Sequence, residues 1–207
     1  MLSTSGVNTA PTSLATARDD DLAVGRGKTY GIMFDVESAA GVSPSSSLAI
    51  VGMDLYLADV TLPTHFEVWT KPGSWQDSDA AVARLGAPEN RPAADYLAGF
   101  RRVSHGTLPE RAPASSSQFT QVPFRDVVLA GGEGVRQAFW ITLSDNLLLF
   151  RSRQSHGGSG RTVQASNAEL RVFLGMAVRT YPLELADPAS DFWNDAGFLG
   201  RIWTKLV

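Results

Sequence analysis

Side chains that bind metals are the first to consider, and they are sparse in this chain. There is no cysteine, and the three histidines are widely separated, without the His-x-His or His-Glu-x-x-His spacing of a zinc site. Calcium prefers clustered oxygens, and Asp187, Asp191 and Asp195 offer carboxylates in one stretch near the C-terminus. Helix caps or solvated acids are the alternative interpretation of these three residues. The sequence indicates no cofactor.

The sequence also contains no clear motif for nucleophilic or acid–base catalysis. The segment Gly157–Arg161 departs from the Gly-x-Ser-x-Gly elbow at its last position, which is arginine. The acids Asp35, Glu37, Asp54 and Glu67 fall on expected strands, and two carboxylates facing each other across a cleft would suit glycoside hydrolysis. We expect solvated or edge-protecting roles for them instead. The chain is therefore expected not to be an enzyme.

Aromatic residues give a stronger binding signal, and they centre on the stretch His65–Trp75. It predicts a strand that ends at a Pro-Gly turn, with Glu67 and Trp69 on the face opposite to the apolar positions. The same alternation turns Tyr56 outward from the preceding strand. Flat rings beside polar groups suit a sugar, so Tyr56, Glu67, Trp69 and Trp75 are ligand-binding candidates. Alternatively, Tyr56 and Trp69 form a cross-strand pair or are covered by the long connection that follows.

Three arginines form a second candidate surface. Arg151 and Arg153 lie on one face of an expected strand, and Arg171 lies on a later strand. Guanidinium groups on a rigid sheet bind carboxylates, sulfates or an acidic partner surface. An edge strand kept soluble by its charge is the alternative. The net charge of the chain is -3, so these residues make a local patch, and no nucleic-acid partner is expected.

A period of two residues dominates the chain and predicts its fold class. Strands are expected at Thr29–Glu37 and over residues 49–57, the latter with His65–Trp75 as its hairpin partner. Turn signals recur at short intervals, whereas helix signals are limited to Asp79–Leu85 and a turn at Asp187-Pro188. This pattern predicts an all-β protein: a single antiparallel β-sandwich, jelly-roll-like, with long loops and little helix.

The length and composition fit one globular domain. The 207 residues are 43% hydrophobic and 19% charged, which suffices for one full hydrophobic core. Residues 1–27 are expected to form a flexible N-terminal arm, with an extended edge strand as the alternative, and residues 28–207 to form the sandwich. No apolar run reaches the roughly 20 residues that span a bilayer, so no transmembrane segment is expected. The arm also lacks the features of a signal peptide.

Six segments together resemble a known domain family. They are Gly31–Glu37, Glu67–Trp75, Gln137–Leu143, Ala165–Val172, Tyr181–Leu183 and Gly200–Trp203. In this order and spacing they resemble an uncharacterised β-sandwich domain found in large secreted or surface proteins of diatoms and some bacteria. The resemblance extends from Lys28 to the C-terminus. It implies a sandwich fold and an extracellular or cell-surface location, and it carries over no catalytic residue.

These features predict a non-catalytic binding domain that recognises carbohydrate or matrix, as surface proteins do. Its partner would be a glycan or a protein surface. One alternative is a structural or accessory subunit that packs against copies of itself or into a larger complex. A second alternative is a hydrolase on a β-sandwich scaffold.

Overall fold

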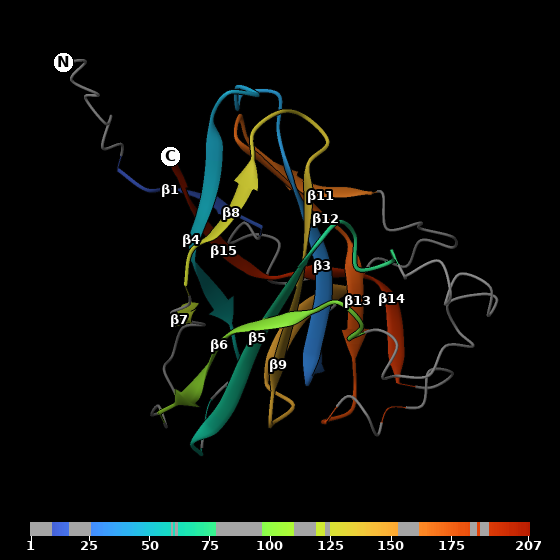
Figure 1. Ribbon diagram of the computed structural model, residues 1–207. Helices are drawn as coiled ribbons and strands as arrows, with labels where there is room; N and C mark the ends of the chain where they lie inside the picture. Colours follow the sequence, from blue (N-terminus) through green and yellow to red (C-terminus); the bar gives the residue numbers. More distant parts are fainter. Residues whose placement is uncertain are drawn as a thin grey trace.

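Two antiparallel β-sheets pack face to face in the computed structural model of the protein (Figure 1). The structure describes residues 10–16, 26–58, 60, 62–77, 97–109, 119–122, 125–152, 162–182, 186 and 191–207. Within these residues every strand pair is antiparallel and there is no helix, hence none long and apolar enough to cross a membrane. The sheets remain two separate layers and do not close into a barrel. The predicted all-β antiparallel sandwich with little helix is confirmed.

The smaller sheet has the strand order β1-β15-β4-β7, and β8 also pairs with β4. Its strands are β1 (Thr12–Ala15), β4 (Ser47–Tyr56), β7 (Phe119–Val122), β8 (Val127–Ala130) and β15 (Gly200–Leu206). Strand β1 lies within the segment expected to be a flexible arm, and it pairs along its whole length with β15. For these residues the edge-strand alternative is therefore correct.

The larger sheet has the strand order β2-β10-β14-β13-β3-β9-β5-β6, and β12 joins β11 to β3. Its strands are β2 (Arg26–Thr29), β3 (Gly31–Ser38), β5 (Thr64–Pro72), β6 (Arg101–Leu108), β9 (Arg136–Leu143), β10 (Leu148–Ser152), β11 (Val163–Ser166), β12 (Leu170–Phe173), β13 (Gly175–Val178) and β14 (Phe192–Phe198). The chain crosses between the sheets from β1 to β2, β3 to β4, β4 to β5, β6 to β7, β8 to β9 and β14 to β15. Repeated crossing of this kind is typical of jelly-roll connectivity.

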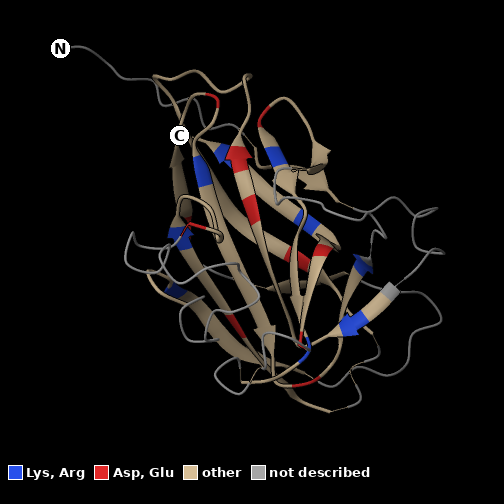
Figure 2. Cartoon of the chain, turned by 90° about the vertical axis from the view of Figure 1, so that its right-hand side faces the viewer, with Lys and Arg blue, Asp and Glu red and all other residues tan. Residues whose placement is uncertain are grey.

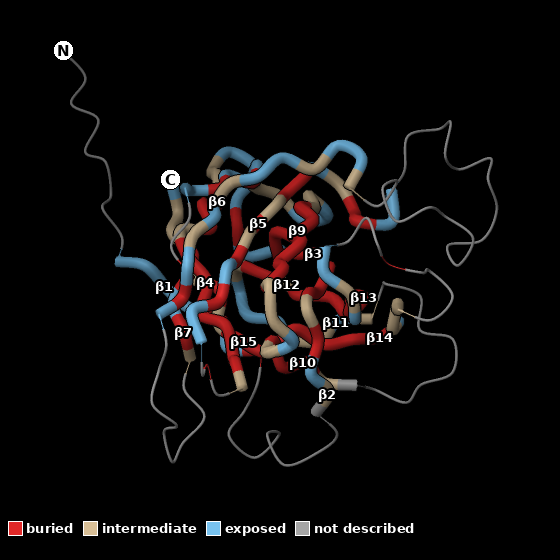
Figure 3. The backbone as a smooth tube through the Cα atoms, turned by 90° about the horizontal axis from the view of Figure 1, so that it is seen from below, coloured by how far each residue is buried: buried red, intermediate tan, exposed pale blue. Residues whose placement is uncertain are grey.

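The main hydrophobic core fills the space between the two sheets. Alternate residues of β3, namely Ile32, Phe34 and Val36, face this core and are fully buried. The Phe34 ring stacks on Phe198 of β14, with ring centroids 4.6 Å apart, and lies 5.9 Å from Phe139 of β9. Figure 3 shows the buried residues gathered where the strands of the two layers face each other.

A second apolar layer covers the outer face of the larger sheet. It includes Met33 of β3, Trp140 of β9 and Met176 of β13, and Trp75 packs against them from the turn after β5. Because β3 has apolar neighbours on both faces, all eight of its residues are buried. The outer face of this sheet is therefore partly closed by the connections that lie over it.

A β-bulge in β4 changes which residues face the core. Consecutive residues of β15 pair with Ile50 and Gly52, which leaves Val51 without a partner. As a result, both Ile50 and Met53 point into the main core, one on each side of the bulge. Simple alternation along the expected strand 49–57 puts Ala49, Val51 and Met53 on one face; the structure follows it from Met53 onward but not before Gly52.

The stretch His65–Trp75 forms β5 and the turn after it, but its partners differ from the expected ones. β5 lies between β9 and β6 in the larger sheet, whereas β4 belongs to the smaller sheet. The predicted β4–β5 hairpin is wrong because the connection crosses from one sheet to the other. Residue alternation within a strand gives its two faces and does not identify its neighbours.

Candidate functional site

Glu67 and Trp69 project from the outer face of β5, as expected, while Val68 between them lies in the main core. Trp69 is directly opposite Trp140 of β9 in the strand register. A pocket of about 80 Å³ opens at this point, which we call the aromatic pocket. It is lined by Glu67, Trp69, Leu97, Trp140, Thr142, Tyr181 and Pro182.

Polar contacts fix the orientation of the Trp69 ring. Its Nε1–H donates to Oε2 of Glu67 at 3.2 Å. The other oxygen of Glu67 lies 2.6 Å from Nη1 of Arg102 on β6, and the Arg102 guanidinium is 5.7 Å from the Trp69 ring centroid. Trp69 is half-buried. Part of an immobilised indole therefore remains open to solvent beside an ion pair.

The pocket has a buried floor and an exposed rim. Trp140 is 1% exposed and forms the floor, and its ring lies against Gly31 of β3. A Cβ atom at Gly31 would be 2.3 Å from the indole, so only glycine leaves room for the ring there. Tyr181, which is 36% exposed, contributes to the rim. Aromatic surface thus extends from β5 to the connection after β13.

Two of the four ligand-binding candidates, Tyr56 and Trp75, are buried and do not line the aromatic pocket. Tyr56 is fully buried in the smaller sheet, where its ring is 5.5 Å from that of Phe119. Trp75 is 5% exposed and packs into the apolar layer beneath its own turn. The alternative of a Tyr56–Trp69 cross-strand pair is also wrong, because the two residues belong to different sheets. Alternation placed Tyr56 on the correct strand face but could not show what covers it.

A buried carboxylate holds the turn that carries Trp75. Asp35 of β3 accepts hydrogen bonds from the Ser74 hydroxyl and, at 2.8 Å, from the Trp75 backbone N–H. The Ser74 N–H in turn donates to Asp77 at 2.8 Å. Burial raises the pKa of Asp35 to about 6, although these hydrogen bonds and Arg136, 4.0 Å away, act in the opposite direction. Asp35 therefore links the central strand to the turn after β5.

The neighbouring charges on the same face form a chain of ion pairs. Glu37 lies 2.8 Å from Arg136 of β9 and 3.1 Å from Arg171 of β12, and Arg171 also pairs with Glu133 at 2.7 Å. Figure 2 shows acidic residues within strands as well as in the connections. The expectation of solvated acids is wrong for Asp35, and equally for Glu37, which is 6% exposed. Neither carboxylate lines the aromatic pocket.

The predicted arginine patch is not assembled on neighbouring strands. Arg151 lies on β10, which pairs with β2 and β14, whereas Arg171 lies on β12, which pairs with β11 and β3. The Arg171 guanidinium already contacts two carboxylates. Arg153 lies outside the described residues. Arg171 is thus a structural residue of the charge network.

The calcium candidates gain no support from their placement. Asp187 lies outside the described residues, as do the two predicted helical segments. Asp195 of β14 is 8% exposed and has a left-handed backbone conformation, with φ of 58°, and Asp191 precedes that strand. Across the described ranges, no three His, Asp or Glu side chains gather closely enough to hold a metal ion.

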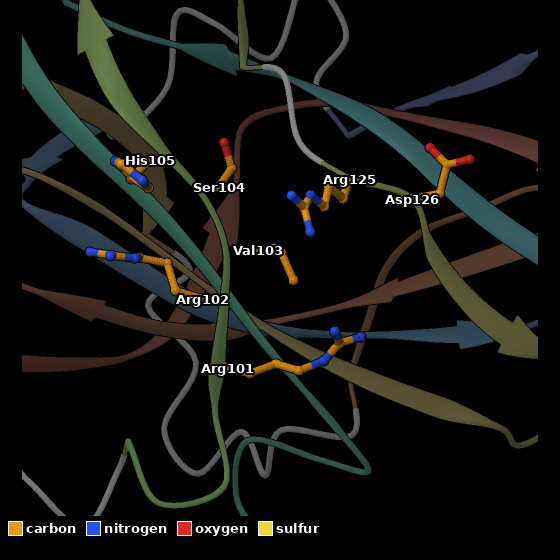
Figure 4. A pocket seen from close by; sticks show the side chains of 7 residues that line it. All are labelled: Arg101, Arg102, Val103, Ser104, His105, Arg125 and Asp126. Atoms are coloured by element: carbon orange, nitrogen blue, oxygen red, sulfur yellow. The ribbon is translucent and has the colours of Figure 1, made fainter.

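Sequence reasoning missed a second and larger pocket, of about 590 Å³ (Figure 4). We call it the edge groove. It is lined by Arg101, Arg102, Val103, Ser104, His105, Arg125 and Asp126. The basic residues come from β6 and from the segment before β8, so no single stretch of sequence indicated that they meet.

Comparison with known proteins leaves the function to be inferred from this geometry. No protein-family model matches the chain, and no curated protein matches it. The two surfaces that carry binding chemistry are the aromatic pocket and the edge groove. They are neighbours, since Arg102 of β6 lines the groove and also lies beside Trp69.

Proposed function

We propose that the protein is a non-catalytic binding domain that recognises a carbohydrate at the aromatic pocket. The observation that carries this proposal is the partly exposed indole of Trp69, whose Nε1–H donates to Glu67. An aromatic face beside hydrogen-bonding groups suits a sugar ring, whose C–H bonds pack on the indole while its hydroxyls contact polar atoms. The polar groups that line the pocket are the Glu67 carboxylate and the hydroxyls of Thr142 and Tyr181.

The size of the pocket favours a polysaccharide over a small enclosed ligand. Its volume of about 80 Å³ is well below the roughly 300–1,000 Å³ of pockets that enclose small molecules. The ligand would instead lie across the rim, from Trp69 to Tyr181. Binding along a chain of sugars fits the proposed recognition of surface or matrix carbohydrate.

The first test is polysaccharide binding by the Trp69→Ala variant. Pull-down with insoluble cellulose, chitin and xylan, followed by a glycan array, identifies a ligand for the wild type. Trp69→Ala should then weaken binding about tenfold or more, because it removes the stacking surface. Tyr181→Ala should weaken binding to a smaller extent, since Tyr181 lies at the rim.

Trp203→Ala is the matched control. Trp203 is also half-buried, but it lies on β15 in the smaller sheet, away from the aromatic pocket. This variant should bind the polysaccharide as the wild type does. Unchanged binding by Trp69→Ala, or equal losses in the Trp69 and Trp203 variants, would contradict the proposed site.

A further inference from the structure

The edge groove lies along one open side of the sandwich. β6 is the last strand of the larger sheet, and β5 is its sole strand partner in the part of the chain that the structure describes. Across the opening, Arg125 and Asp126 lead into β8, which pairs with β4 at the margin of the smaller sheet. The groove is therefore bounded by the edges of two sheets.

The lining residues show that the groove follows the edge of β6. Five consecutive residues, 101–105, line it. Successive side chains of a strand point to opposite faces of the sheet. Because the groove is lined by side chains from both faces, it runs along the edge of the strand and not over one face. A strand edge presents backbone N–H and C=O groups to an incoming chain. An extended polypeptide is the ligand that matches this geometry.

A bulge at Val103 shapes this part of β6. Ser104 pairs with Val68 and Arg102 pairs with Trp69, which leaves Val103 as the extra residue. Val103 packs against the main core. The groove therefore has an apolar contact at its base, next to the arginines that line it.

The charges of the groove favour an acidic ligand. Arg102 pairs with Glu67 on the outer face, but Arg101 and Arg125 form no ion pair with another residue that the structure describes. Figure 4 shows the side chains of Arg101 and Arg125 directed toward the same opening, with Asp126 farther along it. Two unpaired guanidinium groups are well suited to carboxylates, which they bind through paired hydrogen bonds.

We propose that the edge groove binds an extended, acidic peptide segment of a partner protein, which adds to β6 as a further strand. Backbone hydrogen bonds to β6 supply affinity, and Arg101 and Arg125 select carboxylate side chains. The volume of about 590 Å³ accommodates several side chains of such a segment. This site is separate from the carbohydrate pocket and does not depend on it.

Fluorescence anisotropy with a short, capped peptide of alternating Glu and Val tests the proposal. The Glu/Val peptide should bind saturably, and added salt should weaken its binding. The matched peptide with Gln in place of Glu should bind roughly tenfold or more weakly. Absence of saturable binding by the Glu/Val peptide at concentrations up to about 1 mM overturns the proposal.

Strand addition is tested by N-methylation of alternate residues in the same peptide. This change keeps the charges and removes the backbone donors, so binding should be lost. A sulfated polysaccharide serves as the competing probe. If it and the N-methylated peptide bind as tightly as the unmodified peptide, the groove is a general polyanion site and strand addition is overturned.

Charge-reversal variants locate the site. Arg101→Glu and Arg125→Glu should each weaken peptide binding at least about tenfold. Lys28→Glu makes the same change in charge at an exposed position of β2, the opposite edge of the larger sheet, and should bind as the wild type does. Wild-type binding by both arginine variants overturns the proposal. Trp69→Ala should bind the peptide as the wild type does. The peptide proposal and the carbohydrate proposal can therefore fail independently of each other.

Discussion

Wild-type stability should fall by about 2 kcal/mol between pH 4 and pH 7 because of Asp35, and Asp35→Asn should abolish this fall. Burial raises the pKa of Asp35 from 3.8 to about 6 in the folded protein. Between these two values the folded state retains a proton that the unfolded state has released. Stability therefore falls as the pH rises through this window and levels off above it. Asparagine stays neutral throughout and has no such dependence.

Urea unfolding of both proteins at pH 4 and pH 7 measures this effect. Other carboxylates contribute to the pH dependence of each protein, but they are common to the two, so the difference between wild type and variant isolates Asp35. We expect the stability of Asp35→Asn relative to wild type to rise by about 2 kcal/mol from pH 4 to pH 7. Parallel pH profiles of the two proteins would show that Asp35 is not held as a buried, high-pKa carboxyl.

Phe34→Ala should lower the free energy of unfolding by about 3–5 kcal/mol. Phe34 is fully buried and stacks between Phe198 and Phe139, so truncation removes both ring contacts and leaves a cavity in the main core. For a protein of this size, the loss corresponds to a decrease in Tm of roughly 10 °C. Thermal and urea unfolding monitored by circular dichroism give the two values.

Phe119→Ala is the control for this prediction. Phe119 lies on the short strand β7, is half-buried, and contacts Tyr56 and Arg201 at the margin of the smaller sheet. Phe119→Ala should lower the free energy of unfolding by clearly less than Phe34→Ala does. The partly exposed site of Phe119 can admit solvent or collapse around the smaller side chain. A comparable loss in the two variants would mean that the three-ring stack is not a central part of the core.

The fold class was predictable because core-facing and outward-facing residues alternate along most strands. β3 shows this directly: Ile32, Phe34 and Val36 face the main core as their spacing requires. In β4 the same reasoning fails, because one extra residue, Val51, reverses which residues face the core. No residue type in the sequence indicates this bulge. The neighbours of each strand were not predictable either, because the sequence of one strand does not identify the strand that pairs with it. Pairing of β5 with β9 depends on contacts between residues distant in the sequence.

About half of the candidate site was predictable. Glu67 and Trp69 lie on the expected face because the outer face of β5 follows simple alternation. Trp75 does not line the pocket, because Asp35, from another strand, holds its turn against the sheet. Trp140 belongs to the pocket only through its pairing with Trp69. Which residues are covered by other segments, and which residues from different strands meet, depend on the tertiary fold. The spacing of residues along one strand does not predict either.

The position of β15 between β1 and β4 has a consequence for the rate of folding. Residues 12–15 pair with residues 201–204, and the other edge of β15 pairs with β4. The smaller sheet therefore cannot form from locally contiguous strands, and its assembly requires closure of very long loops. Sandwich folds with such distant pairings fold on the millisecond-to-second scale, far more slowly than helical bundles. We expect refolding in that slow range, with the smaller sheet as the last part to acquire protection from hydrogen exchange.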